Sequence, residues 1–178
     1  MRRWLFLLLL TLATPAAATV LLPADFVTVV TGADLIVAGR VVDVRAQLAD
    51  GSRTIESVVT VAVQESVKGA TGNQVTFRVP NGQLGRYRRI TVGAPEFVAG
   101  DRVVLFLRGR GPELPTLFGL SQGVYRVAGD GASAVVTPPA VLARGVAAER
   151  VVRGDPARRP LALPAFLAQV RSAMEPVR

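Results

Sequence analysis

The sequence predicts a mainly β protein: a small, partly open β-barrel, with a short N-terminal element before it and an amphipathic helix at its C-terminus. Three observations carry this prediction. Half of the chain is apolar, and valine and alanine rather than aromatic residues dominate, which favours strands over a helical bundle. Short runs with period-two alternation recur between turns that contain glycine or proline. Near the C-terminus, apolar residues recur at helical spacing instead.

Residues 1–18 have the layout of a secretory signal peptide. A basic start is followed by an apolar run over residues 4–13 and by small side chains at Ala16 and Ala18, which is the pattern that a signal peptidase needs. We therefore expect cleavage before Thr19 and a secreted or periplasmic protein.

The alternative for the N-terminus is an uncleaved membrane anchor. Residues 4–22 contain no charge, and about 20 apolar residues are enough to span a bilayer. Pro15 interrupts this run, which favours the signal peptide. A lipoprotein is excluded at this position because lipid attachment needs a cysteine and the chain has none.

After cleavage, residues 19–178 have a normal size for one domain. Without cysteine no disulfide is available, so a hydrophobic core must supply the stability. The net charge of +8 becomes +6 when Arg2 and Arg3 leave, and Lys68 is the only lysine. This basic character indicates either an ordinary solvated surface or a surface that binds an anionic partner outside the cytoplasm, such as a polysaccharide or lipid head groups.

The first two elements of the mature chain differ in how clearly they can be assigned. Residues 22–32 fit either a short helix, which Asp25 would cap, or a strand. Residues 35–45 are rich in β-branched residues and predict a strand. The apolar residues before and after Gly39 are out of phase, so we expect a bulge or bend at this glycine.

The clearest alternation of the chain lies in residues 59–63, where valine alternates with Thr60 and Ala62. This strand is expected to run on to Gly69. Residues 75–79 predict a third strand that stops before Pro80, because proline cannot donate to a ladder.

A long glycine-rich loop is expected from Gln83 to Gly100, with a short possible strand at residues 90–92. Residues 102–108 are apolar on both faces and predict a central strand. Residues 124–128 and 133–136 are expected to pair as a hairpin across Gly129-Asp130-Gly131.

The predicted organisation is a barrel domain over residues 19–140, a linker over 141–162 and a helix over 163–175. The helix is indicated by Pro164 in its first turn and by an apolar stripe: Leu163, Phe166, Leu167, Val170 and Met174. We expect this stripe to pack on the barrel. The alternative is a helix that binds a partner or a membrane surface.

Several of these runs resemble a known family. Residues 33–42, continued by Thr60–Val63 and Val67–Gly69, resemble the start of the netrin and metalloproteinase-inhibitor type of oligonucleotide/oligosaccharide-binding (OB) barrel. The chain is also similar to uncharacterised secreted bacterial proteins that carry this module, through Gly93-Ala94-Pro95 with Phe97, Gly100 and Val103–Leu107, and through the Phe166-Leu167-x-x-Val170 helix.

The resemblance covers residues 22–175 in outline and implies an OB-like barrel. It also implies protease inhibition as a possible role. Metalloproteinase inhibitors of this type bind the protease zinc through an N-terminal cysteine, whereas cleavage here would expose Thr19. Inhibition would therefore need a wedge-like loop instead.

Enzymatic function is disfavoured by what the sequence lacks. The chain contains no histidine and no cysteine, so a Ser-His-Asp triad, a Cys-His pair and a zinc site of nitrogen and sulfur ligands are excluded. Ser66 and Lys68 do not have Ser-x-x-Lys spacing, and no calcium-loop motif occurs. The carboxylates stand singly, so an enzyme would require a pair brought together by the fold. We predict no catalytic residues, no metal and no cofactor.

The best candidate for a binding surface is the cluster Arg86, Tyr87, Arg88 and Arg89 in the glycine-rich loop. Guanidiniums can meet phosphate, sulfate or carboxylate groups, and the tyrosine offers a stacking face. The alternative is that these side chains simply face solvent. Export and the scarcity of aromatic residues argue against nucleic acid. The sequence thus predicts an exported, non-enzymatic binding module for a protein or an anionic surface polymer, with inhibition of a secreted protease as the alternative.

Overall fold

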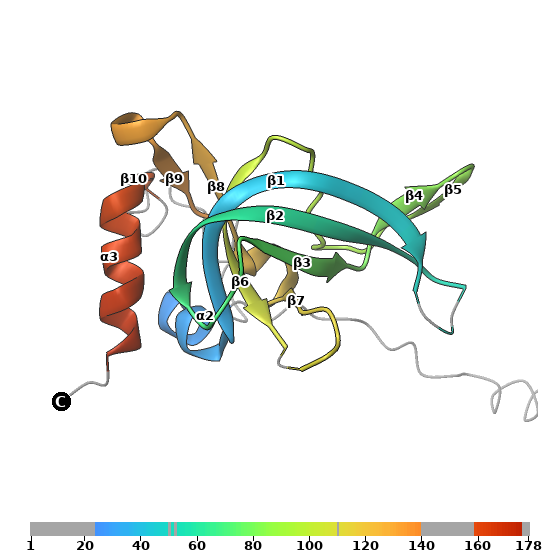
Figure 1. Cartoon of the computed structure of the whole chain (residues 1–178), viewed down its shortest axis with the longest axis horizontal. Coiled ribbons are helices and arrows are strands. Elements are labelled where there is room, and N and C mark those ends of the chain that lie inside the picture. Colours follow the sequence, from blue (N-terminus) through green and yellow to red (C-terminus); the bar gives the residue numbers. More distant parts are fainter. Residues whose placement is uncertain (1–23, 50, 52, 110, 140–158, 176–178) are drawn as a thin grey trace, which may run out of the picture.

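The structure, a computed structural model, describes residues 24–49, 51, 53–109, 111–139 and 159–175. Within these residues the chain forms ten strands, two α-helices and two short 3₁₀ helices (Figure 1). The predicted signal peptide, residues 1–18, and the linker residues 141–158 lie outside the described part of the chain.

Five strands close into a β-barrel at the centre of the structure: β1 (Leu35–Leu48), β2 (Ile55–Lys68), β3 (Gln74–Val79), β6 (Arg102–Arg108) and β7 (Thr116–Leu117). Their order is β1-β2-β3-β7-β6, and β6 pairs again with β1. This is the strand order of an OB-type barrel, so the predicted fold class is confirmed. The barrel is closed rather than partly open, because β7 joins β3 to β6 and β6 pairs with β1. The shortest of these pairings is the parallel one between β3 and β7, which contains one residue pair, Arg78 with Thr116.

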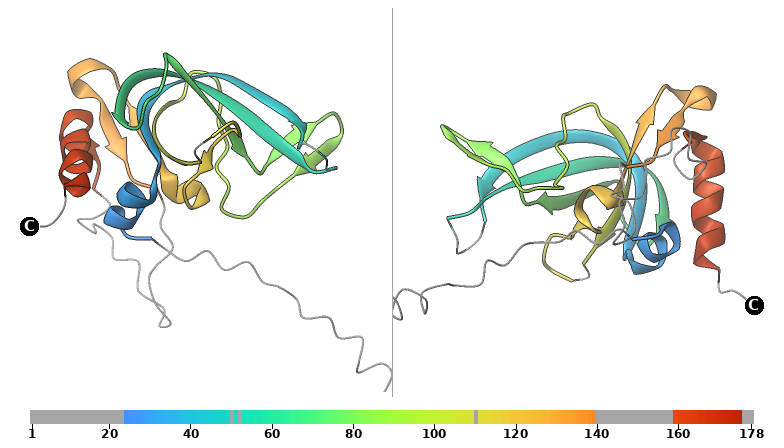
Figure 2. Two further views of the ribbon diagram at one scale, coloured as in Figure 1. Left: turned by 60° about the horizontal axis from the view of Figure 1, so that its bottom comes forward. Right: turned by 180° about the vertical axis from the view of Figure 1, so that it is seen from behind.

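Strand β1 bends at the predicted position. The register between β1 and β2 shifts between Ala38 and Gly39, which confirms the expected bulge, and it shifts again between Val41 and Asp43. A Cβ at Gly39 would lie 2.3 Å from the carbonyl oxygen of Ala62, so only glycine allows this close approach. The first half of β1 pairs with β6 on one side and with β2 on the other, whereas its second half continues with β2 as a long arm (Figure 2).

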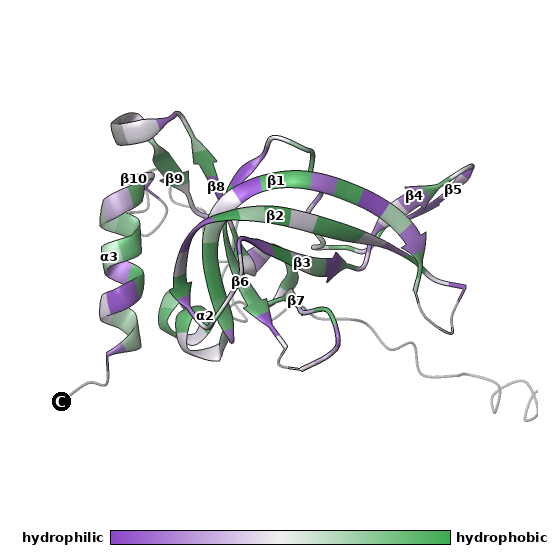
Figure 3. Ribbon diagram, in the orientation of Figure 1, coloured by the Kyte–Doolittle hydropathy of each residue, from purple (hydrophilic) through white to green (hydrophobic). Residues whose placement is uncertain are grey.

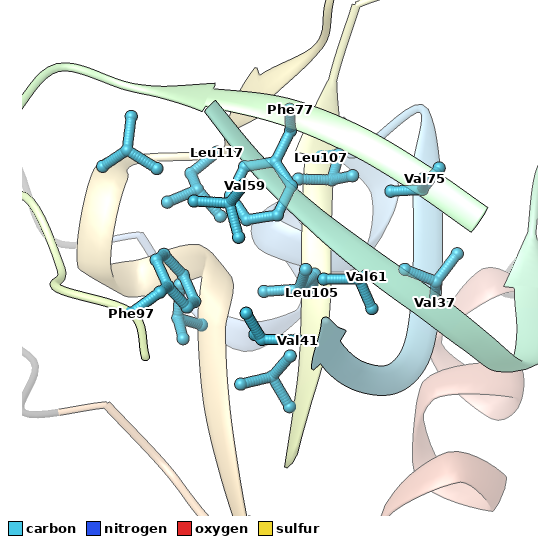
Figure 4. Packing of buried hydrophobic residues seen from close by; sticks show 13 residues of the cluster. Val37, Val41, Val59, Val61, Val75, Phe77, Phe97, Leu105, Leu107 and Leu117 are labelled. Atoms are coloured by element: carbon cyan, nitrogen blue, oxygen red, sulfur yellow. The ribbon is translucent and has the colours of Figure 1, made fainter. Parts of the chain in front are cut away.

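The interior of the barrel is filled by alternate residues of its strands (Figure 4). Val59 and Val61 of β2 are fully buried, as the period-two pattern predicts. Between them Thr60 points outward, and its hydroxyl lies 3.2 Å from that of Thr76 on β3. The colouring in Figure 3 shows the same alternation of apolar and polar residues along the β1–β2 arm.

A second apolar cluster lies outside the barrel, between its wall and two helices, α2 (Phe26–Gly32) and α3 (Leu163–Met174). Strand β6 serves both clusters: Leu105 faces the barrel interior and Phe106 faces the helices, and both are fully buried. This confirms the prediction that residues 102–108 form a central strand. Tyr125 of β8 (Val124–Ala128) joins the cluster, with its ring 4.7 Å from that of Phe166.

Helix α3 confirms the predicted amphipathic helix and its packing on the barrel. Phe166, Leu167 and Val170 are buried, and Leu163 and Met174 pack against the same cluster. The stripe is therefore part of the core rather than a free surface for a partner or a membrane.

Of the two structures predicted for residues 22–32, a short helix or a strand, the structure shows the helix, α2. Asp25 caps α2, because its Oδ1 accepts a hydrogen bond from the backbone N–H of Thr28 at 2.7 Å. At the other end of α2, the Lys68 ammonium donates to the carbonyl oxygens of Val30 and Thr31, both at 3.0 Å. The single lysine of the chain thus satisfies carbonyls that the helix leaves unpaired.

The predicted long loop contains a hairpin that the sequence did not reveal. Strands β4 (Gly82–Leu84) and β5 (Tyr87–Arg89) pair across the turn Gly85-Arg86. The prediction of a strand at residues 90–92 is wrong. Strand β4 pairs with the three preceding residues, Tyr87–Arg89, instead. Ile90 is left 73% exposed.

The hairpin predicted from residues 124–128 and 133–136 is confirmed, but its second strand begins two residues later than expected. Strand β8 pairs with β9 (Val135–Thr137), and the connection contains a 3₁₀ turn at Gly131–Ser133. Another 3₁₀ turn, Leu120–Gly123, precedes β8. Strand β10 (Leu161–Ala162) pairs with β9, so the last two residues of the predicted linker belong to the sheet.

Candidate binding site at the mouth of the barrel

The β4–β5 hairpin projects from the barrel at the end opposite helix α3 (Figures 1 and 2). Its turn has glycine in the first position, with a φ of 59° at Gly85, as tight two-residue hairpin turns require. The base of the hairpin is fixed to β2, because the Ser57 hydroxyl donates to the carbonyl oxygen of Asn81 at 2.7 Å. The base of the hairpin is therefore held at this end of the barrel, which we call its mouth, while the tip projects away from it (Figure 1).

All four residues of the predicted cluster lie on this hairpin, but they do not act alike. Arg86 and Tyr87 form its exposed tip: the guanidinium carbon of Arg86 lies 5.0 Å from the centre of the Tyr87 ring, and Nη2 of Arg86 donates to the phenol oxygen at 2.8 Å. The tyrosine is 61% exposed. This pair presents a cation and an aromatic ring to solvent.

Arg88 and Arg89 are turned back toward the barrel. Nη2 of Arg88 forms an ion pair with Glu96 at 2.6 Å, and Nη1 of Arg89 donates to the carbonyl oxygen of Ile55 at 3.2 Å. The expected group of three equivalent guanidiniums is therefore divided between the tip and the base of the hairpin.

A cleft of about 280 Å³ opens between the hairpin and the barrel. Arg88, Arg89 and Glu96 are its charged residues. Its remaining lining comes from the barrel, the base of the hairpin and the segment after it: Val44, Ser57, Val59, Asn81, Gly82, Gln83 and Phe97. The cleft thus combines two guanidiniums with polar groups and with a few apolar side chains of the barrel.

The segment that carries Glu96 and Phe97 is held in place by Arg126 of β8. Arg126 donates to the carboxylate of Asp101 and to the carbonyl oxygen of Glu96, and its guanidinium lies 5.2 Å from the centre of the Phe97 ring. The Phe97 ring also contacts Phe77 of the barrel core at 5.4 Å. Sequence reasoning missed Arg126, because it lies 30 residues from Glu96 in the chain.

Residues 84–98, which we call the docking segment, also expose apolar side chains. Five of the ten exposed large apolar residues among the described residues lie in it: Leu84, Tyr87, Ile90, Val92 and Val98. Val92 is 89% exposed, and Val98 is 67% exposed. Such a concentration in a short segment is unusual for scattered surface residues.

The structure offers no metal site in its described part, where no group of three or more metal-ligating side chains comes together. Within the same residues, no helix is both long enough and apolar enough to cross a membrane.

Comparison with known protein families, proteins and structures identifies no relative of this chain. No protein-family model matches the chain, and neither a curated protein nor a solved structure shows significant similarity to it. The resemblance to netrin and metalloproteinase-inhibitor barrels therefore stays a prediction.

Proposed function

We propose that this protein is an exported, non-enzymatic binding module that recognises another protein through its docking segment. The observation that carries the proposal is the concentration of exposed apolar side chains between Leu84 and Val98, next to Arg86 and Arg88. Tyrosine and arginine are the residue types that most often dominate the energetics of protein interfaces. Export is inferred from the pattern of residues 1–18.

The exposed apolar residues favour a protein over an anionic polymer. A polymer of charged sugars would use the guanidiniums but would leave Ile90, Val92 and Val98 in water. A protein with an apolar patch bordered by carboxylates would cover these side chains and also complement the arginines. We therefore expect a partner surface that is apolar at its centre and acidic at its rim.

The shape of the hairpin also favours the second candidate, inhibition of a secreted protease. A narrow hairpin that projects from a closed barrel (Figure 1) suits insertion into the cleft of another protein. This route to inhibition does not need an N-terminal cysteine. The two candidates share the same surface and differ in the identity of the partner.

The test is capture of partners from the secretome and envelope extract of the source organism, at low and high salt, with the mature chain, residues 19–178, as bait. The informative bait is the double variant Tyr87→Ser/Ile90→Ser, because both side chains are exposed and the change leaves the core intact. The matched control is Val27→Ser/Leu114→Ser, which removes exposed apolar side chains elsewhere.

The proposal expects a protein that stays bound at high salt, is lost with the double variant and is kept with the control. Apolar contacts survive screening, whereas exposed charge contacts do not. If the captured protein is a protease, its residual activity in the complex decides for or against inhibition. Capture of nothing but an anionic polymer that salt releases would overturn the proposal.

A further inference from the structure

We propose that the cleft under the hairpin binds the C-terminal residue of the partner chain, with the α-carboxylate on Arg88 and Arg89 and an apolar side chain on the base of the cleft. This inference rests on the proposed function, because it assigns the anchor that the partner would use. The cleft uses Arg88, Arg89 and Glu96 of the docking segment, none of which belongs to its five exposed apolar residues.

The first argument is a surplus of hydrogen-bond donors. Each guanidinium has five N–H donors; Arg88 uses one toward Glu96, and Arg89 uses one toward Ile55. The donors of the polar walls are already engaged inside the protein, since the Asn81 amide, for example, donates to Pro95 at 2.8 Å. The cleft therefore needs acceptors, and a carboxylate offers two in the geometry that a guanidinium prefers.

The charge of the cleft leads to the same ligand. Its charged residues are the two arginines and Glu96, so it carries one surplus positive charge. Glu96 is 73% exposed, and it holds Arg88 in an ion pair at the rim. An entering carboxylate would compete with Glu96 for Arg88, so this glutamate acts as an internal competitor of the ligand.

The order of polar and apolar groups with depth distinguishes a chain terminus from an acidic side chain. Val44 is half-buried and Phe97 is 9% exposed, so the apolar surface of the cleft lies deeper than the side chain of Arg88, which is 55% exposed at the rim. A glutamate from a partner would enter with its carboxylate first and would place the charge against the apolar base. A C-terminal residue carries its carboxylate and its side chain on one Cα, so each can reach its own layer.

The size of the cleft limits the ligand to about one residue. Its volume of about 280 Å³ lies just below the range of roughly 300–1,000 Å³ found for clefts that hold drug-sized molecules. A single apolar residue with its carboxylate is therefore the appropriate probe.

The test is an NMR titration of the ¹⁵N-labelled mature chain, residues 19–178, with three probes: N-acetyl-leucine, N-acetyl-leucinamide and the α-amide of N-acetyl-glutamate. N-acetyl-leucine is expected to shift the amide signals of residues 81–97. The leucinamide lacks the carboxylate and is expected to bind at least about tenfold more weakly, because charge-assisted hydrogen bonds are lost. The glutamate probe is expected to bind more weakly than N-acetyl-leucine.

Three variants make the titration specific. R88Q and R89Q are each expected to lower the affinity for N-acetyl-leucine by at least about fivefold. E96Q is expected to raise this affinity by about two- to fivefold, since the internal competitor is removed. A gain of affinity cannot arise from unfolding, so E96Q keeps the inference testable even if an arginine variant is unstable.

The matched controls are R171Q and E65Q. These residues form an exposed ion pair on α3 and β2, and α3 lies at the opposite end of the molecule from the hairpin (Figure 1). Neither control should change the affinity. The inference would be overturned if the leucinamide bound as tightly as N-acetyl-leucine, or if the glutamate probe bound more tightly than N-acetyl-leucine. It would also be overturned if E96Q bound N-acetyl-leucine more weakly than the unaltered protein does.

The two proposals fail in different experiments. Loss of capture without any effect on the titration would contradict the protein-binding function and leave the carboxylate site in place. Salt-resistant capture that depends on Tyr87 and Ile90, together with no binding of N-acetyl-leucine, would contradict the site and leave the function in place.

Discussion

Tyr125 has an unusual environment for an ionisable side chain. It is 7% exposed, and its ring packs against Phe106 and Phe166 of the second cluster. Burial disfavours the charged phenolate and raises the pKa of Tyr125 from 10.0 to about 12. The folded protein therefore keeps the phenol proton at pH values where the unfolded chain has lost it.

This pKa predicts alkaline destabilisation. The contribution of Tyr125 to stability is complete below pH 10 and is lost as the pH rises from 10 toward 12. At about pH 11.5 the loss amounts to about 2 kcal/mol, at about 1.4 kcal/mol per unit of pKa. Urea unfolding as a function of pH measures it. Tyr125→Phe keeps the ring and removes the titration, so its free energy of unfolding should fall less steeply; equal slopes would contradict the prediction.

Gly39 shows what single residues reveal in a sequence and what they do not. The phase change of the apolar pattern around it predicted the bulge in β1, because one inserted residue moves the following side chains to the opposite face of the strand. Arg126 gave no such signal. Its role depends on Asp101 and Glu96, which reach it only after β6 and β8 have paired.

At the scale of elements, helices and strands could be predicted where their apolar residues repeat with one period over several residues. Residues 59–63 and the stripe of α3 repeat a period often enough to be recognised. Strands β4 and β5 have three residues each, and their side chains are mostly exposed, so no alternation marks them. The tendency of Ile90 and Val92 toward strands was overridden by the turn at Gly85. The four candidate residues could be named from the sequence, but the division of their side chains between the tip of the hairpin and the cleft could not.

The segment from Glu96 to Asp101 depends on β8 for its position, and this dependence can be tested. Arg126→Leu removes the donors to Asp101 and Glu96, so the backbone N–H of Val98, which donates to Asp101 at 2.9 Å, should lose its protection. A loss of about 1–2 kcal/mol corresponds to hydrogen exchange that is about 5- to 30-fold faster.

Hydrogen exchange of the Val98 and Gly100 amides measures the effect. The control is Arg45→Leu, because Arg45 is also an exposed strand arginine paired with a carboxylate, that of Asp43 at 2.5 Å. Unchanged exchange at Val98 in Arg126→Leu would show that the segment does not need β8. In that case the position of Glu96 in the cleft would depend on the hairpin instead.

At the scale of the whole molecule, two apolar clusters share the strands β1 and β6. Val37 and Leu105 belong to the barrel interior, whereas their neighbours Ile36 and Phe106 belong to the cluster under the helices. Neither cluster can lose its packing without disturbing strands that the other one needs. The candidate site at the barrel mouth and the helices at the opposite end (Figure 1) are thus supported by one continuous framework.

This shared framework predicts a single unfolding transition. Phe77→Ala empties space in the barrel and Phe166→Ala empties space under the helices; both side chains are buried, at 0% and 3% exposure, so each change should cost about 3–5 kcal/mol. In urea titrations followed by NMR, the amides of Val61 in β2 and Val170 in α3 report the two clusters separately. Each variant should lower both midpoints equally, because a cooperative unit unfolds as a whole. A variant that shifts the midpoint of its own cluster and leaves the other unchanged would mean that the helices unfold from the barrel independently, and β1 and β6 would then not couple the two ends of the molecule.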